Sequence, residues 1–193
     1  MPNDIPQNLS GLINIAELCP SSEALGPGKR FVIWVQGCPF ECKGCIAPDW
    51  IPFRKAHTMS IEELAERIVA EPEICGLTIS GGEPFMQASR LATLLRKVKA
   101  QRPSLNVITF SGFRINQLNW QDALALLAET DVLIAGLFVE KLNNGRGLKG
   151  SSNQTVHFLT PSLLPFKEEL ENGQRGLEFH LRVEGGHLMV GIP

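Results

Sequence analysis

The sequence has no apolar run long enough to cross a bilayer, because its longest, such as DVLIAGLFV (131–139), stop well short of about 20 residues. It also has no excess of either charge, since 18 Lys and Arg against 20 Asp and Glu give a net charge of −2. Neither a membrane nor a nucleic acid is therefore expected as a partner. Residues 1–11 lack the basic and apolar regions of a signal peptide. We expect a cytoplasmic protein, whose cysteines are ligands or buried side chains rather than disulfides.

Strands and helices alternate along the first two thirds of the chain. Apolar β-forming runs predict strands over 30–37, 75–80, 106–112 and 131–136, and amphipathic runs predict helices over 60–71, 87–101 and 116–130. This alternation indicates an α/β fold with a mostly parallel sheet. Right-handed crossovers bring the strand ends to one edge, where ligands of such folds bind. Each notable motif follows a strand: the cysteines, SGGEP, SGF and GLF, in that order.

The α/β rhythm ends after residue 140. A polar, glycine-rich stretch predicts a loop over 141–154, followed by a further strand at 155–159 and a short helix within 161–173. Two alternating segments, 177–183 and 187–192, predict a terminal β-hairpin. Residues 1–10 have little to bury and read as a loose tail.

Three of the five cysteines, Cys38, Cys42 and Cys45, follow the first predicted strand with the spacing Cys-x3-Cys-x2-Cys. Structural zinc requires a fourth ligand, and the nearest candidate, His57, has a spacing that suits no common zinc finger. A 4Fe-4S cluster usually takes four thiolates, so three would leave one iron free for another ligand. An iron–sulfur cluster is favoured over zinc and over a chance grouping of thiols in a loop.

This cysteine spacing after a first strand resembles the signature of the radical S-adenosylmethionine superfamily. The resemblance implies an open, partial (β/α) barrel and a 4Fe-4S cluster whose free iron is chelated by S-adenosylmethionine. It further implies reductive cleavage to methionine and a 5′-deoxyadenosyl radical, with no catalytic residues beyond the cluster ligands. The enzyme is thus expected to be an oxidoreductase.

The turns after the next two strands resemble the superfamily's cofactor-binding motifs. Gly81 and Gly82 would let the backbone approach the methionine end closely, and Glu83 would accept a hydrogen bond from its ammonium group. Alone, such a turn is more often structural than functional, but its place at a strand end favours the site. The expected cofactor-binding residues are Gly44, Gly81, Gly82, Glu83, Pro84, Ser111 and Gly112.

Longer segments resemble one subgroup, the activating enzymes of glycyl radical enzymes such as anaerobic ribonucleotide reductase. GPGKRFVIWVQGCPFECKGC, LTISGGEP, TFSGF, DVLIAGLF and LKGSSNQTVHFL occur in the subgroup's order, with Lys149 where arginine is usual. The match predicts a core domain over 26–159, a lead-in over 1–25 and a C-terminal extension over 160–193. It assigns to the partner loop the residues Lys149, Ser151, Ser152, Asn153 and Gln154.

The resemblance implies that the radical removes a hydrogen atom from a backbone glycine of a partner enzyme, with a flavodoxin- or ferredoxin-type electron donor. The extension and the atypical N-terminus leave open a radical enzyme that acts on a peptide, another protein or a small metabolite. A non-enzymatic zinc- or cluster-binding module is the third alternative. The two other cysteines, Cys19 and Cys75, are too few for a second cluster held by protein alone.

Overall fold

The computed structural model describes residues 11–181 and 185–193. The expected tail over 1–10 lies outside the described residues, as does the expected end of the first hairpin strand at 182–183. Within the described ranges, no helix is long and apolar enough to cross a membrane.

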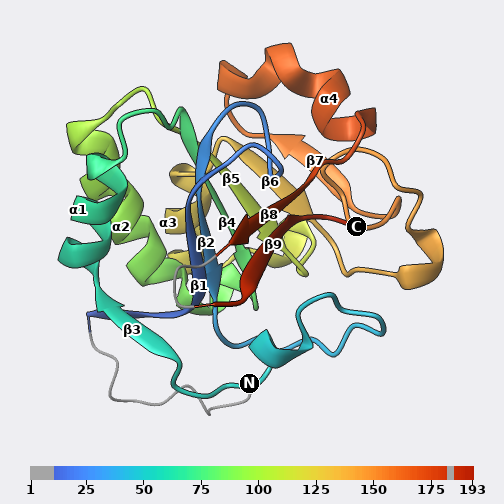
Figure 1. Cartoon of the computed structure of the whole chain (residues 1–193), viewed down its shortest axis with the longest axis horizontal. Coiled ribbons are helices and arrows are strands. Elements are labelled where there is room, and N and C mark those ends of the chain that lie inside the picture. Colours follow the sequence, from blue (N-terminus) through green and yellow to red (C-terminus); the bar gives the residue numbers. More distant parts are fainter. Residues whose placement is uncertain (1–10, 182–184) are drawn as a thin grey trace.

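The centre of the molecule is a seven-stranded sheet with the order β3-β1-β2-β4-β5-β6-β7 (Figure 1). Strands β2, β4, β5 and β6 are parallel, whereas β1, β3 and β7 pair antiparallel with their neighbours. Strands β3 and β7 are the two edges, so the sheet is not closed, and the predicted open α/β architecture is confirmed. The strands are β1 (Leu12–Ser22), β2 (Arg30–Val35), β3 (His57–Ser60), β4 (Gly76–Gly81), β5 (Asn106–Ser111), β6 (Val132–Ala135) and β7 (Thr155–Phe158).

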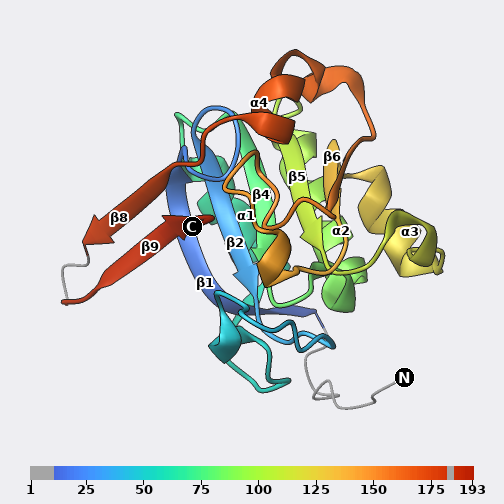
Figure 2. The ribbon, with the colours of Figure 1, turned by 90° about the vertical axis from the view of Figure 1, so that its right-hand side faces the viewer.

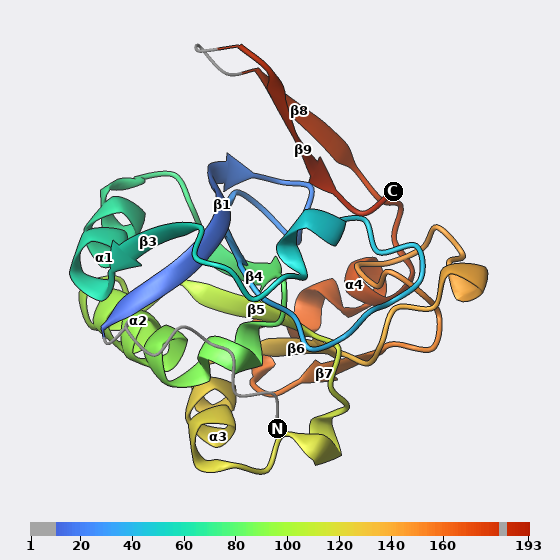
Figure 3. The same ribbon diagram turned by 90° about the horizontal axis from the view of Figure 1, so that it is seen from below.

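Three α-helices cover one face of this sheet: α1 (Ile61–Ala70), α2 (Ala88–Gln101) and α3 (Gln121–Ala128). They lie side by side along one flank of the molecule (Figure 3). Their buried aliphatic side chains share a hydrophobic core with Ile33, Leu77 and Val107 of the parallel strands. Helix α1 begins at the predicted cap, where Ser60 Oγ accepts a hydrogen bond from Glu63 N at 3.1 Å.

The C-terminal extension packs against the other face of the sheet. It consists of the 3-10 helix η5 (Pro161–Phe166), α4 (Lys167–Asn172) and a hairpin of β8 (Leu177–Leu181) and β9 (His187–Gly191). Leu163, Leu170 and Val190 form a second core with side chains of β2, β5 and β6. The predicted terminal hairpin is confirmed, and it projects beyond the sheet (Figure 2).

The structure differs from the sequence-based expectations in two strands that were not predicted and in one predicted helix that is divided in two. No strand was predicted before Arg30, yet β1 lies inside the sheet and contains the buried Asn14. The side chain of Asn14 donates to Arg54 O and accepts from Ala56 N, and the Gln87 side chain bonds the backbone N and O of Asn14. These bonds are tertiary and leave no periodic signal. The edge strand β3 was likewise not predicted.

The helix expected over 116–130 is divided into the 3-10 helix η3 (Ile115–Gln117) and α3. The chain turns between the two because Leu118 enters the core, where it is buried. Arg114 N donates a hydrogen bond to Gln117 Oε1, which closes the first of the two pieces. Packing of one side chain thus overrides the local helical pattern.

The segment GPGKR (26–30) has a structural role, which its last residue, Arg30, shows. Its side chain is 0% exposed and lies at the start of β2, away from the strand ends that carry the motifs. The guanidinium donates to Thr78 Oγ1 at 2.8 Å, to Leu77 O at 2.7 Å and to Pro27 O at 3.2 Å. Burial lowers the pKa of Arg30 to about 10. The arginine therefore joins β2, of which it is the first residue, to β4 and to Pro27 in the segment before β2.

Replacing Arg30 tests this structural role. Arg30→Met replaces the guanidinium with a long apolar side chain and so removes every donor. The buried oxygens that Arg30 contacts then lose their partner, and the free energy of unfolding should fall by about 2–3 kcal/mol. Urea denaturation measures the change. Arg67→Met, on the exposed face of α1, should alter stability by no more than about 0.5 kcal/mol. Equal effects of the two substitutions would contradict the assignment.

Candidate functional site

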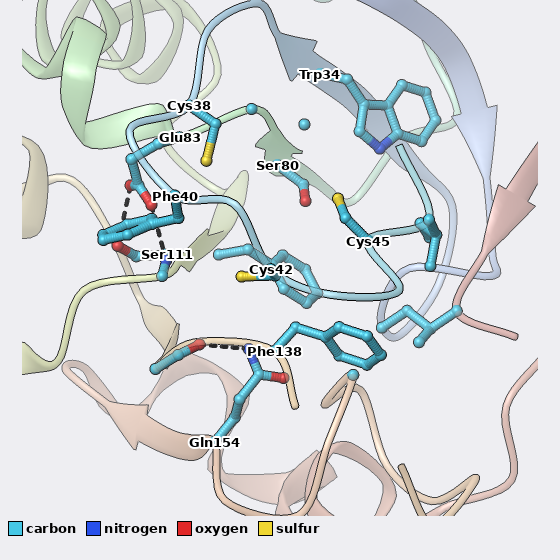
Figure 4. Close-up of a pocket in the computed structure, with 18 of the residues that line it drawn as sticks. Trp34, Cys38, Phe40, Cys42, Cys45, Ser80, Glu83, Ser111, Phe138 and Gln154 are labelled. Atoms are coloured by element: carbon cyan, nitrogen blue, oxygen red, sulfur yellow. Dashed lines mark hydrogen bonds between the residues drawn. The ribbon is translucent and has the colours of Figure 1, made fainter. Parts of the chain in front are cut away.

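A cavity lies at the C-terminal edge of the parallel strands, where the motifs were predicted to meet. All three clustered cysteines line it, together with residues that follow β4, β5 and β6 (Figure 4). The predicted residues that it brings together are Cys38, Cys42, Cys45, Gly81, Gly82, Glu83, Ser111, Gly112 and Gln154.

The cysteine loop is closed at its base by backbone hydrogen bonds. Gly37 N donates to Trp50 O and Cys38 N to Ile51 O, each at 2.9 Å, and the Gln36 side chain donates to Pro52 O at 2.7 Å. Within the loop, Gly44 has a φ of +75°, a conformation that glycine adopts without strain. The three thiols are therefore held on a short loop with a fixed base at the end of β2.

The thiols are partly buried, which disfavours their charged form unless a cation is bound. Burial raises the pKa of Cys38 to about 12 and also raises the pKa of Cys42. Among the described residues, no three His, Cys, Asp or Glu side chains are grouped around a single ion position. In a cubane, each thiolate binds a different iron, so the sulfurs need not converge on one point. Three soft donors around one cavity fit such a cluster.

Gly81 and Gly82 have a reason to be glycine within the protein itself. A Cβ on Gly82 would lie 2.3 Å from Gly37 O, and one on Gly81 would lie 2.4 Å from Val35 N. Gly82 N donates to Val35 O at 2.7 Å, and Glu83 N donates to Gly37 O at 2.8 Å. The turn after β4 is therefore in direct backbone contact with the first residue of the cysteine loop.

Glu83 joins the turns after β4 and β5. It is 1% exposed, and its Oε1 accepts from Phe85 N at 3.0 Å and from Ser111 Oγ at 2.9 Å, while Oε2 accepts from Gly112 N at 2.7 Å. Burial raises the pKa of Glu83 to about 7, although these donors act in the opposite direction. The hydroxyl proton of Ser111 is thus used by Glu83, and Oε2 accepts one hydrogen bond, from Gly112 N.

The Gly-Ser-Ser-Asn-Gln segment supports the wall formed after β6. Gln154 Nε2 donates to Gly136 O at 2.7 Å, Asn153 Nδ2 donates to Leu137 O at 2.9 Å, and Ser151 Oγ accepts from Val139 N at 3.1 Å. Ser151 is buried, whereas Ser152 and Asn153 are exposed. Most of the polar atoms in this segment therefore bind the protein's own loop.

Several predicted residues do not line the cavity: Gly44, Pro84, Lys149, Ser151, Ser152 and Asn153. Gly44 and Pro84 shape turns, since Pro84 begins the 3-10 helix η2 (Pro84–Gln87). His57, weighed as a fourth zinc ligand, lies in β3 and is also outside the lining. Asn153 instead lines an adjoining cavity that shares Phe40, Gly112 and Gly136 with the first.

Sequence reasoning missed most of the apolar wall. Trp34, Phe40, Phe110, Phe138 and Ile192 line the cavity. Phe138 follows a strand and could have been found by its position, but Trp34 and Phe110 alternate within strands as core residues do. Ile192 carries no sequence signal, because only the folding of the extension brings it to this edge.

Comparison with known proteins shows which family the chain belongs to. Residues 24–157 match the family described as "4Fe-4S single cluster domain". The anaerobic ribonucleoside-triphosphate reductase-activating protein of Vibrio cholerae is 30% identical over 156 residues, which cover 77% of this chain and 99% of that protein. The protein of the same description from Escherichia coli K12 is 29% identical, over 76% and 99%. The chain belongs to this 4Fe-4S, radical S-adenosylmethionine family of activating proteins.

Membership identifies the cofactors as a 4Fe-4S cluster and S-adenosylmethionine, and the chain as a radical enzyme. Among solved structures, QueE from Escherichia coli is similar with a TM-score of 0.40 and 15% identity, over 52% of each chain. The family model ends at residue 157, so the whole C-terminal extension over 160–193 lies outside it. The cysteine loop and all three following turns lie inside it.

Gly82→Ala tests the backbone contact at the base of the cysteine loop. Because the added Cβ would overlap Gly37 O, the substitution should displace the loop and lower the iron bound after anaerobic reconstitution to under about half of the wild-type content. Gly176→Ala is the matched control, since its Cβ has open space to 4.0 Å. Full iron content in Gly82→Ala would contradict the claim that the cysteine loop depends on the contact between Gly82 and Gly37.

Proposed function

We propose that this chain installs a glycyl radical on a partner enzyme, with an anaerobic ribonucleotide reductase as the first candidate. Cys38, Cys42 and Cys45 would hold the cluster in this chain, and the turns after β4 and β5 would bind S-adenosylmethionine. The observation that carries the proposal is the convergence of three thiols and one buried carboxylate on a single cavity, in a chain matched over 99% of a reductase-activating protein's length.

When bound, the cluster and S-adenosylmethionine supply an electron and a 5′-deoxyadenosyl radical. The protein's own task is to bind, orient and shield. Glu83, fixed by three donors, would accept from the ammonium group through Oε2, where one hydrogen bond is already made. Gly81 and Gly112 present backbone at the same edge. The apolar side chains of Trp34, Phe110 and Phe138 would exclude water from the reacting atoms.

The surroundings of the cavity suit a macromolecular substrate. Ile46 lines the cavity and is 55% exposed, and the exposed side chains of Leu137 and Val139 line the adjoining cavity. Exposed apolar side chains grouped at a site are typical of surfaces that bind other proteins. We therefore assign this rim, with the exposed Ser152 and Asn153, to the partner's glycine loop. An electron donor of the flavodoxin or ferredoxin type completes the proposal.

The decisive assay combines the reconstituted protein, S-adenosylmethionine, a reductant and a candidate glycyl radical enzyme. Electron paramagnetic resonance should detect a glycyl doublet, together with release of 5′-deoxyadenosine. A partner variant that lacks the acceptor glycine serves as the control and should give no doublet. Cleavage of S-adenosylmethionine without a doublet on any glycyl radical enzyme would instead favour a peptide or a small metabolite as the substrate.

Cysteine substitutions test the ligand assignment. Cys42→Ala should abolish both iron–sulfur absorption and release of 5′-deoxyadenosine, because two thiolates do not hold the cubane. Cys75→Ala should leave both unchanged, since Cys75 Sγ lies near Pro27 O and Lys29 O and not in the cavity. Loss of the cluster in Cys75→Ala alone would show that the ligands were wrongly chosen.

A further inference from the structure

The end of the C-terminal extension reaches the cofactor cavity. Gly191 and Ile192 line the same cavity as the three cysteines, although almost 150 residues separate Ile192 from Cys45. Both residues lie beyond the part of the chain that matches the family model, residues 24–157. The cavity wall in this chain is therefore completed by a segment that the family match does not include.

Packing holds this segment against the cavity. Val190 is fully buried in the second core, and Ile192 packs against the same core, which contains Leu25 and Trp34. Gly191 has a φ of +131°, and a Cβ there would lie 2.3 Å from Gly176 O, so the chain can turn towards the cavity only because this residue is glycine. The position of Ile192 is thus set by its own packing and by the two residues before it.

Arg175 joins the segment to the loop over residues 143–149 by hydrogen bonds. Its Nη1 donates to Pro193 O at 2.8 Å and to Asn143 Oδ1 at 2.7 Å. Its Nε donates to Gly147 O at 3.2 Å, and its Nη2 donates to Lys149 O. The loop that contains Gly147 and Lys149 continues directly into Gly150 and Gln154, which line the cavity. One guanidinium therefore joins the end of the extension to the Gly-Ser-Ser-Asn-Gln wall.

The charge that lines the cavity lies to one side of it, where Phe40 is also found (Figure 4). Glu83 is the one charged residue among the described residues that line it, and it lies beside Cys38 and Ser111 (Figure 4). Trp34 and Phe138 lie across the cavity from Glu83 in the same view. S-adenosylmethionine has its charged groups at the methionine end and a flat aromatic base at the other. If the methionine end lies at Glu83, the nucleoside lies towards Trp34, and Ile192 packs against the core that contains Trp34.

We propose that Ile192 contacts the nucleoside of S-adenosylmethionine and that Arg175 is the positioning residue that holds the Ile192 segment in place. The proposal rests on the proposed function only in taking this cavity as the S-adenosylmethionine site. It makes the C-terminal extension a part of the cofactor site rather than an appendage. No contact between Ile192 and the partner enzyme is required.

Binding measurements on the reconstituted full-length protein test the contact without any partner enzyme. Ile192→Ala removes apolar contact area, so the dissociation constants of S-adenosylmethionine and of 5′-deoxyadenosine should each rise about fivefold, while that of methionine stays the same. Leu181→Ala is the matched control, because Leu181 lies in the same extension and is 87% exposed. Weaker binding of methionine, or unchanged binding of 5′-deoxyadenosine, would overturn the assignment.

Arg175 is tested by its effect on the same constants. Arg175→Ala should weaken 5′-deoxyadenosine binding in the same direction without loss of iron–sulfur absorption, and Arg175→Lys should restore part of it, because an ammonium group replaces only some of the donors. Arg146→Ala is the control and should have no effect, because Arg146 is exposed and lies in the loop that Arg175 contacts. Equal behaviour of the alanine variants at 175 and 146 would overturn the positioning role.

The two proposals fail in different ways. Wild-type protein that binds and cleaves S-adenosylmethionine but gives no glycyl doublet would end the partner assignment and leave the Ile192 contact standing. Wild-type protein that forms the cluster and yields a doublet, with unchanged 5′-deoxyadenosine binding in Ile192→Ala, would end the contact and leave the proposed function standing. Thermal unfolding of each variant identifies any substitution that acts by unfolding the chain.

Discussion

The site depends on the backbone contact between the turn after β4 and the base of the cysteine loop. Gly82 lies so close to Gly37 that no side chain fits between them, and two hydrogen bonds, from Gly82 N and Glu83 N, join the segments. This contact places Cys38, immediately after Gly37, beside the carboxylate of Glu83. Under the proposed assignment, the distance between a cluster ligand and a group that binds S-adenosylmethionine is thereby set by backbone rather than by flexible side chains.

Burial of Glu83 extends this constraint along the sheet edge. A carboxylate that is almost wholly removed from water needs donors, and the protein supplies them from Phe85 N, Ser111 Oγ and Gly112 N. The turns after β4 and β5 are consequently fixed to each other. Gln154 does the same for the turn after β6, through Gly136 O. Each strand end is thus held by a neighbour before any cofactor binds, which reduces the ordering that binding requires.

Sequence patterns predicted the parallel strands, the cysteine cluster and the edge at which the motifs meet, because buried parallel strands and metal-ligand spacing leave local signals. They did not predict β1, whose polar Asn14 is satisfied by tertiary hydrogen bonds. They treated Gly81, Gly82 and Ser111 as ligand-facing, whereas the structure gives each an internal partner as well. Ile192 and Arg175 could not be found, since their role arises only when the extension packs on the second core.

The central claim is that the three-cysteine cluster offers one iron to S-adenosylmethionine in the cavity beside Glu83. Electron nuclear double resonance of the reduced, reconstituted protein, with S-adenosylmethionine labelled with ¹⁵N in its amino group and ¹⁷O in its carboxylate, measures this directly. The account predicts hyperfine coupling of both labels to the cluster. Full cluster content with no coupling from either label would contradict it.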